Sequence, residues 1–140
     1  MKRYVIIVAG GKGLRMGGDL PKQFIPMAGK PVLMHTIEKF WMWDNQINII
    51  LVLPIAHQAY WKMLCKEIGC KAPHRIVNGG ETRFHSVQNG LNAIREEIEV
   101  SGEKALIAVH DGVRPFVSPE VISVCFSKAE ETGAVVPALP

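Results

Sequence analysis

Cysteine is scarce in this sequence, and Cys65, Cys70 and Cys125 include no Cys-x-x-Cys pair. The sequence therefore argues against a disulfide framework or a structural zinc site, and it favours buried, inert thiols. No apolar run approaches the roughly 20 residues that a membrane helix needs. The apolar stretch 5–9 is also too short for the core of a signal peptide, and it suits a buried strand better. These absences predict a cytoplasmic protein that does not contact a membrane.

Acidic residues are almost missing from the first 30 positions. Residues 1–30 hold six basic residues and one acidic residue, whereas the remaining chain holds ten basic and twelve acidic ones. Positive charge gathered at one end favours an anionic ligand, although a solvated basic surface explains the charge equally well by itself. Basic residues are not interleaved with aromatic ones, so the pattern does not indicate nucleic-acid binding.

Short apolar runs alternate with helical patterns along the chain. Runs typical of strands buried on both faces occupy residues 4–9, 47–53, 75–77, 104–110 and 134–138. Helices are predicted from Pro31 onward, over 57–68 with Gly69 as its end, over 83–99, and from Ser118 as N-cap to Gly133. This alternation predicts one α/β domain with a parallel sheet. The last run begins a strand that no helix follows, which suggests a fragment of a longer domain.

The helical period of 3.6 residues predicts which side chains of each helix face the core. The predicted inward sets are Leu33, Ile37, Phe40 and Trp41; Tyr60, Leu64 and Ile68; Val87, Leu91, Ile94 and Ile98; and Val121, Val124 and Cys125.

A glycine-rich segment, residues 9–18, directly follows the first predicted strand. Parallel α/β folds bind ligands at this edge of the sheet, and glycine lets backbone N–H groups approach a phosphate closely. The segment lacks the Walker pattern, and Met16 stands where a dinucleotide fingerprint needs its third glycine. What remains is a loop with Lys12 and Arg15, followed by Pro-Lys-Gln-Phe at 21–24; a plain strand-to-helix turn stays open as the alternative.

The run Ala-Gly-Gly-x-Gly-x-Arg-Met with Pro-Lys-Gln close behind resembles the signature of sugar-nucleotide and alditol-phosphate nucleotidyltransferases, and Pro-Lys-Gln-Phe resembles their cytidylyltransferase branch. The resemblance implies that Arg15 and Lys22 act catalytically on the α-phosphate. It also implies that the loop wraps a triphosphate through Ala9, Gly10, Gly11 and Gly13. Fixed cations suit this role, because charge develops on the α-phosphate and the departing pyrophosphate during transfer.

A second block, Asn-Gly-Gly-Glu-Thr-Arg-Phe-His-Ser-Val, starts at residue 78 and leads into a helix. It resembles the family block that holds the cytosine base and the ribose. The resemblance implies nucleotide binding by Gly79, Gly80, Arg83 and Ser86, with backbone groups and the Ser86 hydroxyl against the base edge. A tight turn, with Ser86 in the first turn of a helix and Arg83 on the surface, explains the same residues without a ligand.

A third block, Val-His-Asp-Gly-Val-Arg-Pro-Phe at 109–116, ends the fourth predicted strand. It resembles the family's His-Asp-x-x-Arg-Pro, which implies that Asp111 binds a metal and that Asp111 and Arg114 bind substrate. Mg²⁺ favours one or two carboxylates together with phosphate and water ligands. Asp111 could equally cap a turn, and His110 is predicted to be a packed residue at the strand end.

The three blocks in this order and spacing are similar to the N-terminal portion of the 2-C-methyl-D-erythritol 4-phosphate cytidylyltransferase family. The resemblance implies a Rossmann-like three-layer α/β sandwich with a mostly parallel sheet, truncated at the C-terminus, over residues 1–140. It implies transfer of CMP from CTP to the alditol phosphate with Mg²⁺ and release of pyrophosphate, a step of isoprenoid precursor synthesis. A full-length member is expected to be a homodimer whose dimerisation arm and last strands follow residue 140.

Alternatives to this function stay open. The Ala-Gly-Gly start of the first loop resembles ribitol 5-phosphate cytidylyltransferases, whereas Arg-Phe-His-Ser-Val resembles the methylerythritol enzymes. The chain could also be a CTP-binding module without turnover, because the later acceptor-binding residues of the family would follow residue 140. A third alternative is a purine-nucleotide sugar pyrophosphorylase, which would prefer a triphosphate other than CTP.

Overall fold

The computed structural model describes residues 1–10 and 20–135. Their elements follow in the order β1 (Lys2–Val8), the 3₁₀ helix η1 (Lys22–Phe24), β2 (Pro26–Met27), β3 (Lys30–Pro31), α1 (Val32–Trp43), β4 (Asn48–Leu53), α2 (Ile55–Ile68), β5 (Arg75–Asn78), α3 (Arg83–Ser101), β6 (Ala105–Asp111) and α4 (Pro119–Thr132). The first four predicted strands and all four predicted helices are confirmed. The predicted strand over 134–138 falls largely outside the described residues.

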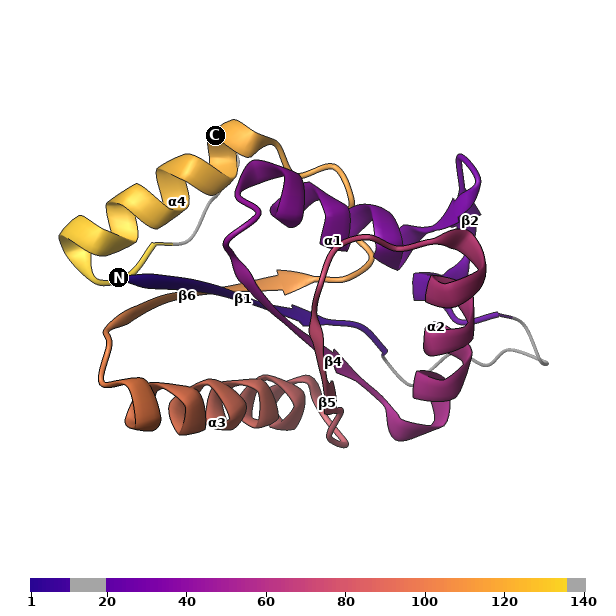
Figure 1. The fold of residues 1–140 in the computed structure, drawn as a ribbon, viewed down its shortest axis with the longest axis horizontal. Coiled ribbons are helices and arrows are strands. Elements are labelled where there is room, and N and C mark those ends of the chain that lie inside the picture. The colour runs from indigo at the N-terminus through magenta and orange to yellow at the C-terminus, as the bar shows by residue number, and fades with distance from the viewer. Residues whose placement is uncertain (11–19, 136–140) are drawn as a thin grey trace.

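The main sheet has the strand order β5-β4-β1-β6, and every neighbouring pair is parallel. In Figure 1, α1 and α4 lie on one side of this sheet and α3 lies on the other. The predicted three-layer α/β sandwich with a parallel sheet is therefore confirmed. Because the strands are parallel, their carboxyl ends all meet at one edge.

The central strand β1 is buried on both faces, as its continuous apolar sequence predicts. Val5 and Ile7 belong to one core, which also contains buried residues of α1 and α4. Tyr4 and Ile6 belong to a second core, shared with α3 through Ile94. Alternation along the strand thus assigns successive side chains to opposite cores.

The hydroxyl of the buried Tyr4 is hydrogen-bonded to a side chain of α3. Its hydroxyl donates to Glu97 Oε1 at 2.9 Å, and Arg75 donates to the other oxygen of that carboxylate at 2.8 Å. Burial, followed by the contact with Glu97, raises the pKa of Tyr4 to about 12. A buried polar group with such a partner costs little stability, whereas an unpaired one is expensive.

The helix ends follow the sequence signals. The Ser118 hydroxyl accepts a hydrogen bond from the Val121 N–H at 3.1 Å, as expected of an N-cap. Gly69 and Gly133 end α2 and α4 in the left-handed conformation, with φ of 90° and 94°. Within the described ranges, no helix is both long and apolar enough to cross a membrane.

The predicted inward face of α4 is wrong. Val121 and Val124 are 40% and 55% exposed, and the buried residues are Ile122 and Phe126. Phe126 stacks on Trp43 of α1 with ring centroids 5.1 Å apart. Packing against Trp43 therefore buries the neighbouring stripe of α4. The hydrophobic period of the sequence does not by itself distinguish the two stripes.

The inward face of α2 also differs from its prediction. Trp61 is fully buried, whereas Tyr60 and Ile68 are 38% and 40% exposed. Trp61 stacks on Phe24 of η1 at 6.3 Å between ring centroids and donates its indole N–H to His74 at 3.0 Å. The short segment of η1, β2 and β3 was not predicted from the sequence, because its elements are too short to show a hydrophobic period.

Gly90 of α3 marks the closest approach between this helix and the sheet. A Cβ at Gly90 would lie 2.9 Å from Ile6 Cγ2 and 3.2 Å from Val52 Cγ2. We expect Gly90→Val to lower the free energy of unfolding by about 1–3 kcal/mol, because overpacking forces side chains off their rotamers. Denaturant unfolding followed by circular dichroism measures this loss.

The matched control is Arg95→Val, which introduces the same side chain at an exposed position of α3. Helix propensity alone makes that change cost less than about 1 kcal/mol. Equal losses in the two variants would contradict a packing role for Gly90.

Candidate functional site

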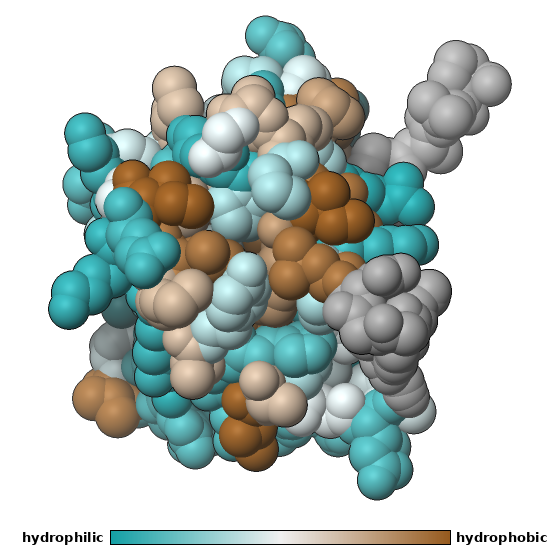
Figure 2. Space-filling model, turned by 90° about the vertical axis from the view of Figure 1, so that its right-hand side faces the viewer, coloured by the Kyte–Doolittle hydropathy of each residue, from teal (hydrophilic) through white to brown (hydrophobic). Residues whose placement is uncertain are grey.

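The site is built where the parallel strands end. Ala9 and Gly10 follow β1, Pro54 follows β4, Gly79 follows β5, and Gly112 follows β6. Three N–H groups tie these ends together: Ala9 N–H to Val52 O at 3.1 Å, Gly79 N–H to Leu53 O at 3.0 Å, and Gly112 N–H to Val8 O at 2.8 Å. Strands β1 and β6 point to the right-hand side of Figure 1, and Figure 2 views the molecule from that side. Apolar side chains lie there among hydrophilic ones, so the face offers both kinds of contact.

Glycine is required at this edge by close backbone packing. Gly10 has a φ of 127°, and a Cβ there would lie 2.3 Å from Pro54 Cδ. A Cβ at Gly112 would lie 2.9 Å from the Cβ of Ala9. The ends of β1, β4 and β6 are therefore packed too tightly for side chains. Gly11, Gly13 and Arg15 lie outside the described residues, so their predicted roles stay predictions.

The two residues that follow Lys22 are buried and anchor its segment in the protein. Lys22 itself is exposed, whereas Gln23 and Phe24 are only 3% and 2% exposed. Phe24 packs edge-on against His57 and Tyr60 of α2, with ring centroids 5.7 and 5.0 Å apart. Lys22 takes part in none of the ion pairs formed among the described residues. Its exposed side chain therefore extends from an anchored segment without an acidic partner from the described part of the chain.

A contact between Gln23 and His57 anchors this segment, and the sequence assigned His57 no role. The Gln23 amide donates to His57 Nδ1 at 3.2 Å. Burial lowers the pKa of His57, which keeps the imidazole neutral and Nδ1 available as an acceptor. The two residues are far apart in the sequence, and an isolated histidine carries no motif. The only sequence signal for the contact between Gln23 and His57 is that Gln23 directly follows Lys22.

The second block forms an interlocked turn at the start of α3. The Gly80 N–H donates to Ser86 Oγ at 3.0 Å, and Ser86 is only 8% exposed. A Cβ at Gly80 would lie 2.4 Å from the Cβ of His85, so this turn requires glycine. The N–H groups of Gly79 and Gly80 are thus bonded within the protein, which leaves the carbonyl oxygens and the Ser86 hydroxyl hydrogen for a base edge.

The third block places Asp111 at the end of β6, in register with Val8. Asp111 Oδ1 accepts from the Val113 N–H at 3.1 Å, and Oδ2 lies 3.7 Å from Arg114 Nε. The turn-capping role that the sequence left open is therefore present. Oδ1 caps the turn, and Oδ2 faces Arg114, whose side chain is 76% exposed.

His110 is a packed residue, as predicted. Its ring lies edge-on against Phe40 at 5.0 Å between centroids, and its Nε2–H donates to Arg114 O at 2.9 Å. Burial lowers the pKa of His110, whereas the hydrogen bond to Arg114 O and the charge of Asp111 oppose this shift. The charges of Arg114 and Arg83 also lower the pKa, with smaller effects. Arg83 of the second block and Arg114 of the third therefore both place positive charge near the same strand end.

The residues at this edge suit a cation that brings most of its own ligands. The described residues contain no group of three or more His, Cys, Asp or Glu side chains that could hold a metal. Asp111 supplies one hard carboxylate oxygen, and Mg²⁺ is commonly bound by one or two carboxylates together with phosphate oxygens and water. The donor set therefore fits Mg²⁺ better than a metal that needs a complete cage of protein ligands.

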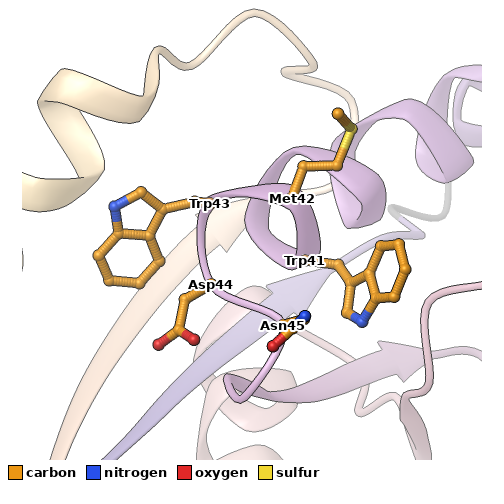
Figure 3. Close-up of a pocket in the computed structure, with 5 residues that line it drawn as sticks. All are labelled: Trp41, Met42, Trp43, Asp44 and Asn45. Atoms are coloured by element: carbon orange, nitrogen blue, oxygen red, sulfur yellow. The ribbon is translucent and has the colours of Figure 1, made fainter.

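A pocket elsewhere on the molecule does not belong to this site. It is lined by Trp41, Met42, Trp43, Asp44 and Asn45 (Figure 3). Arg3, at the start of β1, donates to Asp44 Oδ2 at 3.2 Å, and its guanidinium lies 5.7 Å from the centre of the Trp43 ring. The pocket is therefore near the amino ends of the strands, opposite the edge that carries the three blocks.

Comparison with known proteins gives a consistent result. The family model described as IspD, 2-C-methyl-D-erythritol 4-phosphate cytidylyltransferase, matches residues 4–140. A protein of that name from Phocaeicola vulgatus is 58% identical over 139 residues, which cover 99% of this chain and 60% of the relative. A protein of the same name from Bacteroides thetaiotaomicron is 56% identical over 137 residues, covering 98% of this chain and 59% of the relative.

Solved structures agree with this match. The crystal structure of 4-diphosphocytidyl-2C-methyl-D-erythritol synthase from Anaerococcus prevotii superposes with a TM-score of 0.71 at 28% identity. The match covers 93% of this chain and 51% of that chain. The chain thus spans about 60% of the length of the curated relatives and about half of the solved protein.

The half-buried His57 beside Gln23 predicts a pH dependence of stability. Because the folded-state pKa of His57 is lowered, the unfolded chain binds the proton more tightly below the ordinary histidine pKa of about 6.5. The contribution of His57 to stability is therefore full above that pH and is lost as the pH falls through the lowered value. We expect the Tm to fall between pH 7 and pH 5, and to fall less in His57→Gln. Parallel thermal melts at several pH values measure both slopes, and identical slopes would show that His57 is not coupled to folding.

Proposed function

Since the chain belongs to the IspD family of 2-C-methyl-D-erythritol 4-phosphate cytidylyltransferases, we propose that it binds CTP and transfers CMP to 2-C-methyl-D-erythritol 4-phosphate, releasing pyrophosphate. The observation that carries this proposal is the meeting of three blocks at one edge of the parallel sheet. Ala9 and Gly10, Gly79 and Gly80, and Asp111 come from distant parts of the sequence and lie at the carboxyl ends of strands of one parallel sheet.

The reaction joins the acceptor phosphate to the nucleotide. An oxygen of the acceptor phosphate attacks the α-phosphorus of CTP, and the bond from that phosphorus to the bridging oxygen of the β-phosphate breaks. Lys22, with Arg15 from the glycine-rich loop, stabilises the charge that builds on the α-phosphate and the leaving pyrophosphate. No covalent intermediate with the protein is needed. The anchoring of Gln23 and Phe24 supports this role, since a preorganised cation stabilises charge without moving.

The remaining residues bind and orient the substrates. Gly79, Gly80 and Ser86 hold the cytosine and ribose through carbonyl oxygens and the serine hydroxyl, and Arg83 adds positive charge beside them. Arg114 contacts the acceptor phosphate, a role supported by its exposed guanidinium. Asp111 would hold Mg²⁺ through its Oδ2 oxygen. Bound there, the cation would neutralise triphosphate charge.

The acceptor is proposed from the relatives. Proteins that are 58% and 56% identical carry the methylerythritol name, which favours that acceptor over ribitol 5-phosphate. The ribitol alternative still has the Ala-Gly-Gly start of the loop in its favour.

The chain matches only part of its relatives, and this leaves a second candidate function without turnover. Because the chain covers 60% of the first relative, a CTP-binding module without turnover is the second candidate. The homodimer and the cytoplasmic location expected from the sequence stay predictions.

Lys22→Ala tests the catalytic assignment. With CTP, Mg²⁺ and methylerythritol 4-phosphate, we expect the variant to release pyrophosphate about 100- to 1,000-fold more slowly, the usual loss on removing one such charge-stabilising group. A coupled pyrophosphate assay measures the rate, with ribitol 5-phosphate in parallel wells. Lys104→Ala is the matched control, because Lys104 is exposed and precedes β6, at the opposite edge of the sheet.

Each outcome of this assay separates the candidates. Equal rates in Lys22→Ala and in the unchanged protein would remove Lys22 from the mechanism. Release only with ribitol 5-phosphate would move the protein to that acceptor. CTP binding by calorimetry without release would support the binding module, and no CTP affinity would contradict both candidates.

Asp111→Asn tests the metal assignment without dismantling the turn. The asparagine Oδ1 can still accept from the Val113 N–H, whereas the negative charge is lost. We expect the Mg²⁺ concentration needed for half-maximal CTP binding to rise at least roughly tenfold, the lower end of what even indirect metal partners contribute. Calorimetric titrations at several Mg²⁺ concentrations measure the shift, and an unchanged Mg²⁺ dependence would contradict a metal role for Asp111.

A further inference from the structure

The carboxyl end of α2 brings two of the three cysteines together. Gly69 leaves the helix in the left-handed conformation, and the N–H groups of Gly69 and Cys70 both donate to Cys65 O, at 2.9 and 3.0 Å. In helix ends of this kind, the residue after the glycine folds back onto the last turn. Cys70 is thereby placed against Cys65, although five positions separate them.

The turn places the two cysteines side by side, since the Cys70 N–H donates to Cys65 O at 3.0 Å. The Cys70 thiol donates to Ala72 O at 4.0 Å. Both thiols are half-buried and pack against the core that contains Trp61. A disulfide needs Cα atoms roughly 4.4–6.8 Å apart. The direct backbone hydrogen bond between Cys65 and Cys70 holds their backbones close together, as such a bond requires.

The surroundings shift the pKa values of the two thiols in opposite directions. The hydrogen bond from Cys65 lowers the pKa of Cys70 to about 7, although burial acts in the opposite direction. The same hydrogen bond, with burial, raises the pKa of Cys65. Lys30 and Glu38 influence Cys70 with opposite signs from the neighbouring β3 and α1. A thiolate beside a second thiol is the arrangement found at thiols that undergo reversible oxidation.

We propose that Cys65 and Cys70 are a site of reversible oxidation that closes to an intramolecular disulfide on reaction with a low-molecular-weight disulfide. The Cys70 thiolate attacks one sulfur of the small disulfide, which forms a mixed disulfide and releases one small thiolate. Cys65 then loses its proton and attacks the Cys70 sulfur, which releases the second small thiolate. Two protein thiols are oxidised and the small disulfide is reduced to two thiols, so that atoms and electrons balance.

This proposal differs from the expectation that all three cysteines are inert, which stays a prediction for Cys125. A cysteine pair five residues apart matches no sequence motif, and in a continuous helix its side chains would point in different directions. The left-handed turn at Gly69 reverses the chain and brings the two residues side by side. The proposal concerns the far end of α2 and does not depend on nucleotide transfer.

Oxidised glutathione is the probe for the test. After incubation at neutral pH, we expect the number of titratable thiols to fall from three to one, with a mass lower by two hydrogen atoms and no change in oligomeric state. Trypsin cleaves after Lys62, Lys66 and Lys71, so it separates the two cysteines into peptides 63–66 and 67–71. A disulfide-linked pair of these peptides identifies the bond, and dithiothreitol should restore all three thiols.

Single variants distinguish the two thiols. Cys65→Ser should retain a stable glutathione adduct on Cys70, because the second step is lost. In Cys70→Ser, Cys65 should react roughly tenfold or more slowly at neutral pH, since burial favours its protonated form. Cys125→Ser, on α4, is the control and should form the bond like the unchanged protein. Thermal melts check that each variant is folded.

Four results would overturn the proposal. The first is persistence of three thiols in the unchanged protein, and the second is a stable glutathione adduct on it. The third is an intermolecular disulfide as the main product. A linked peptide pair that includes Cys125 would also contradict it.

Discussion

The pairing of β1 with β4 on one side and with β6 on the other is the constraint on which the rest of the structure depends. Both pairings are parallel, so Val8 stands beside Val52 and beside Asp111 at the same level of the sheet. The loops that follow these strands therefore begin side by side, although their residues are far apart in the sequence. Parallel sheets place ligand sites at this edge for the same reason.

Close packing at the strand ends explains why glycine recurs there. Gly10 lies against Pro54, Gly112 against Ala9, and Gly80 against His85, each at a distance that excludes a side chain. Close packing alone requires glycine at these positions, so a glycine pattern by itself does not separate a structural role from a role in ligand binding.

The polar groups at this edge are fixed before any ligand arrives. Ser86 is bonded to the Gly80 N–H, Asp111 caps its own turn, and Gln23 is held by His57. Lys22 and Arg114 extend from these anchored segments with exposed side chains. A rigid frame with exposed cations suits a polyphosphate, because little reorganisation is needed when charge is bound. The same logic makes α2 a support for the site, since it contributes His57, Tyr60 and Trp61 around Gln23 and Phe24.

The sequence by itself determined the order of strands and helices, the parallel sheet and the three blocks, because hydrophobic periods and glycine spacing are local. It also determined the Ser118 cap and the helix ends at Gly69 and Gly133. The tertiary structure decided which stripe of α4 is buried, because Trp43 of α1 selects Phe126. It also decided the partners of Gln23 and Cys70. These contacts join residues whose spacing follows no period, and only the folded chain brings them together.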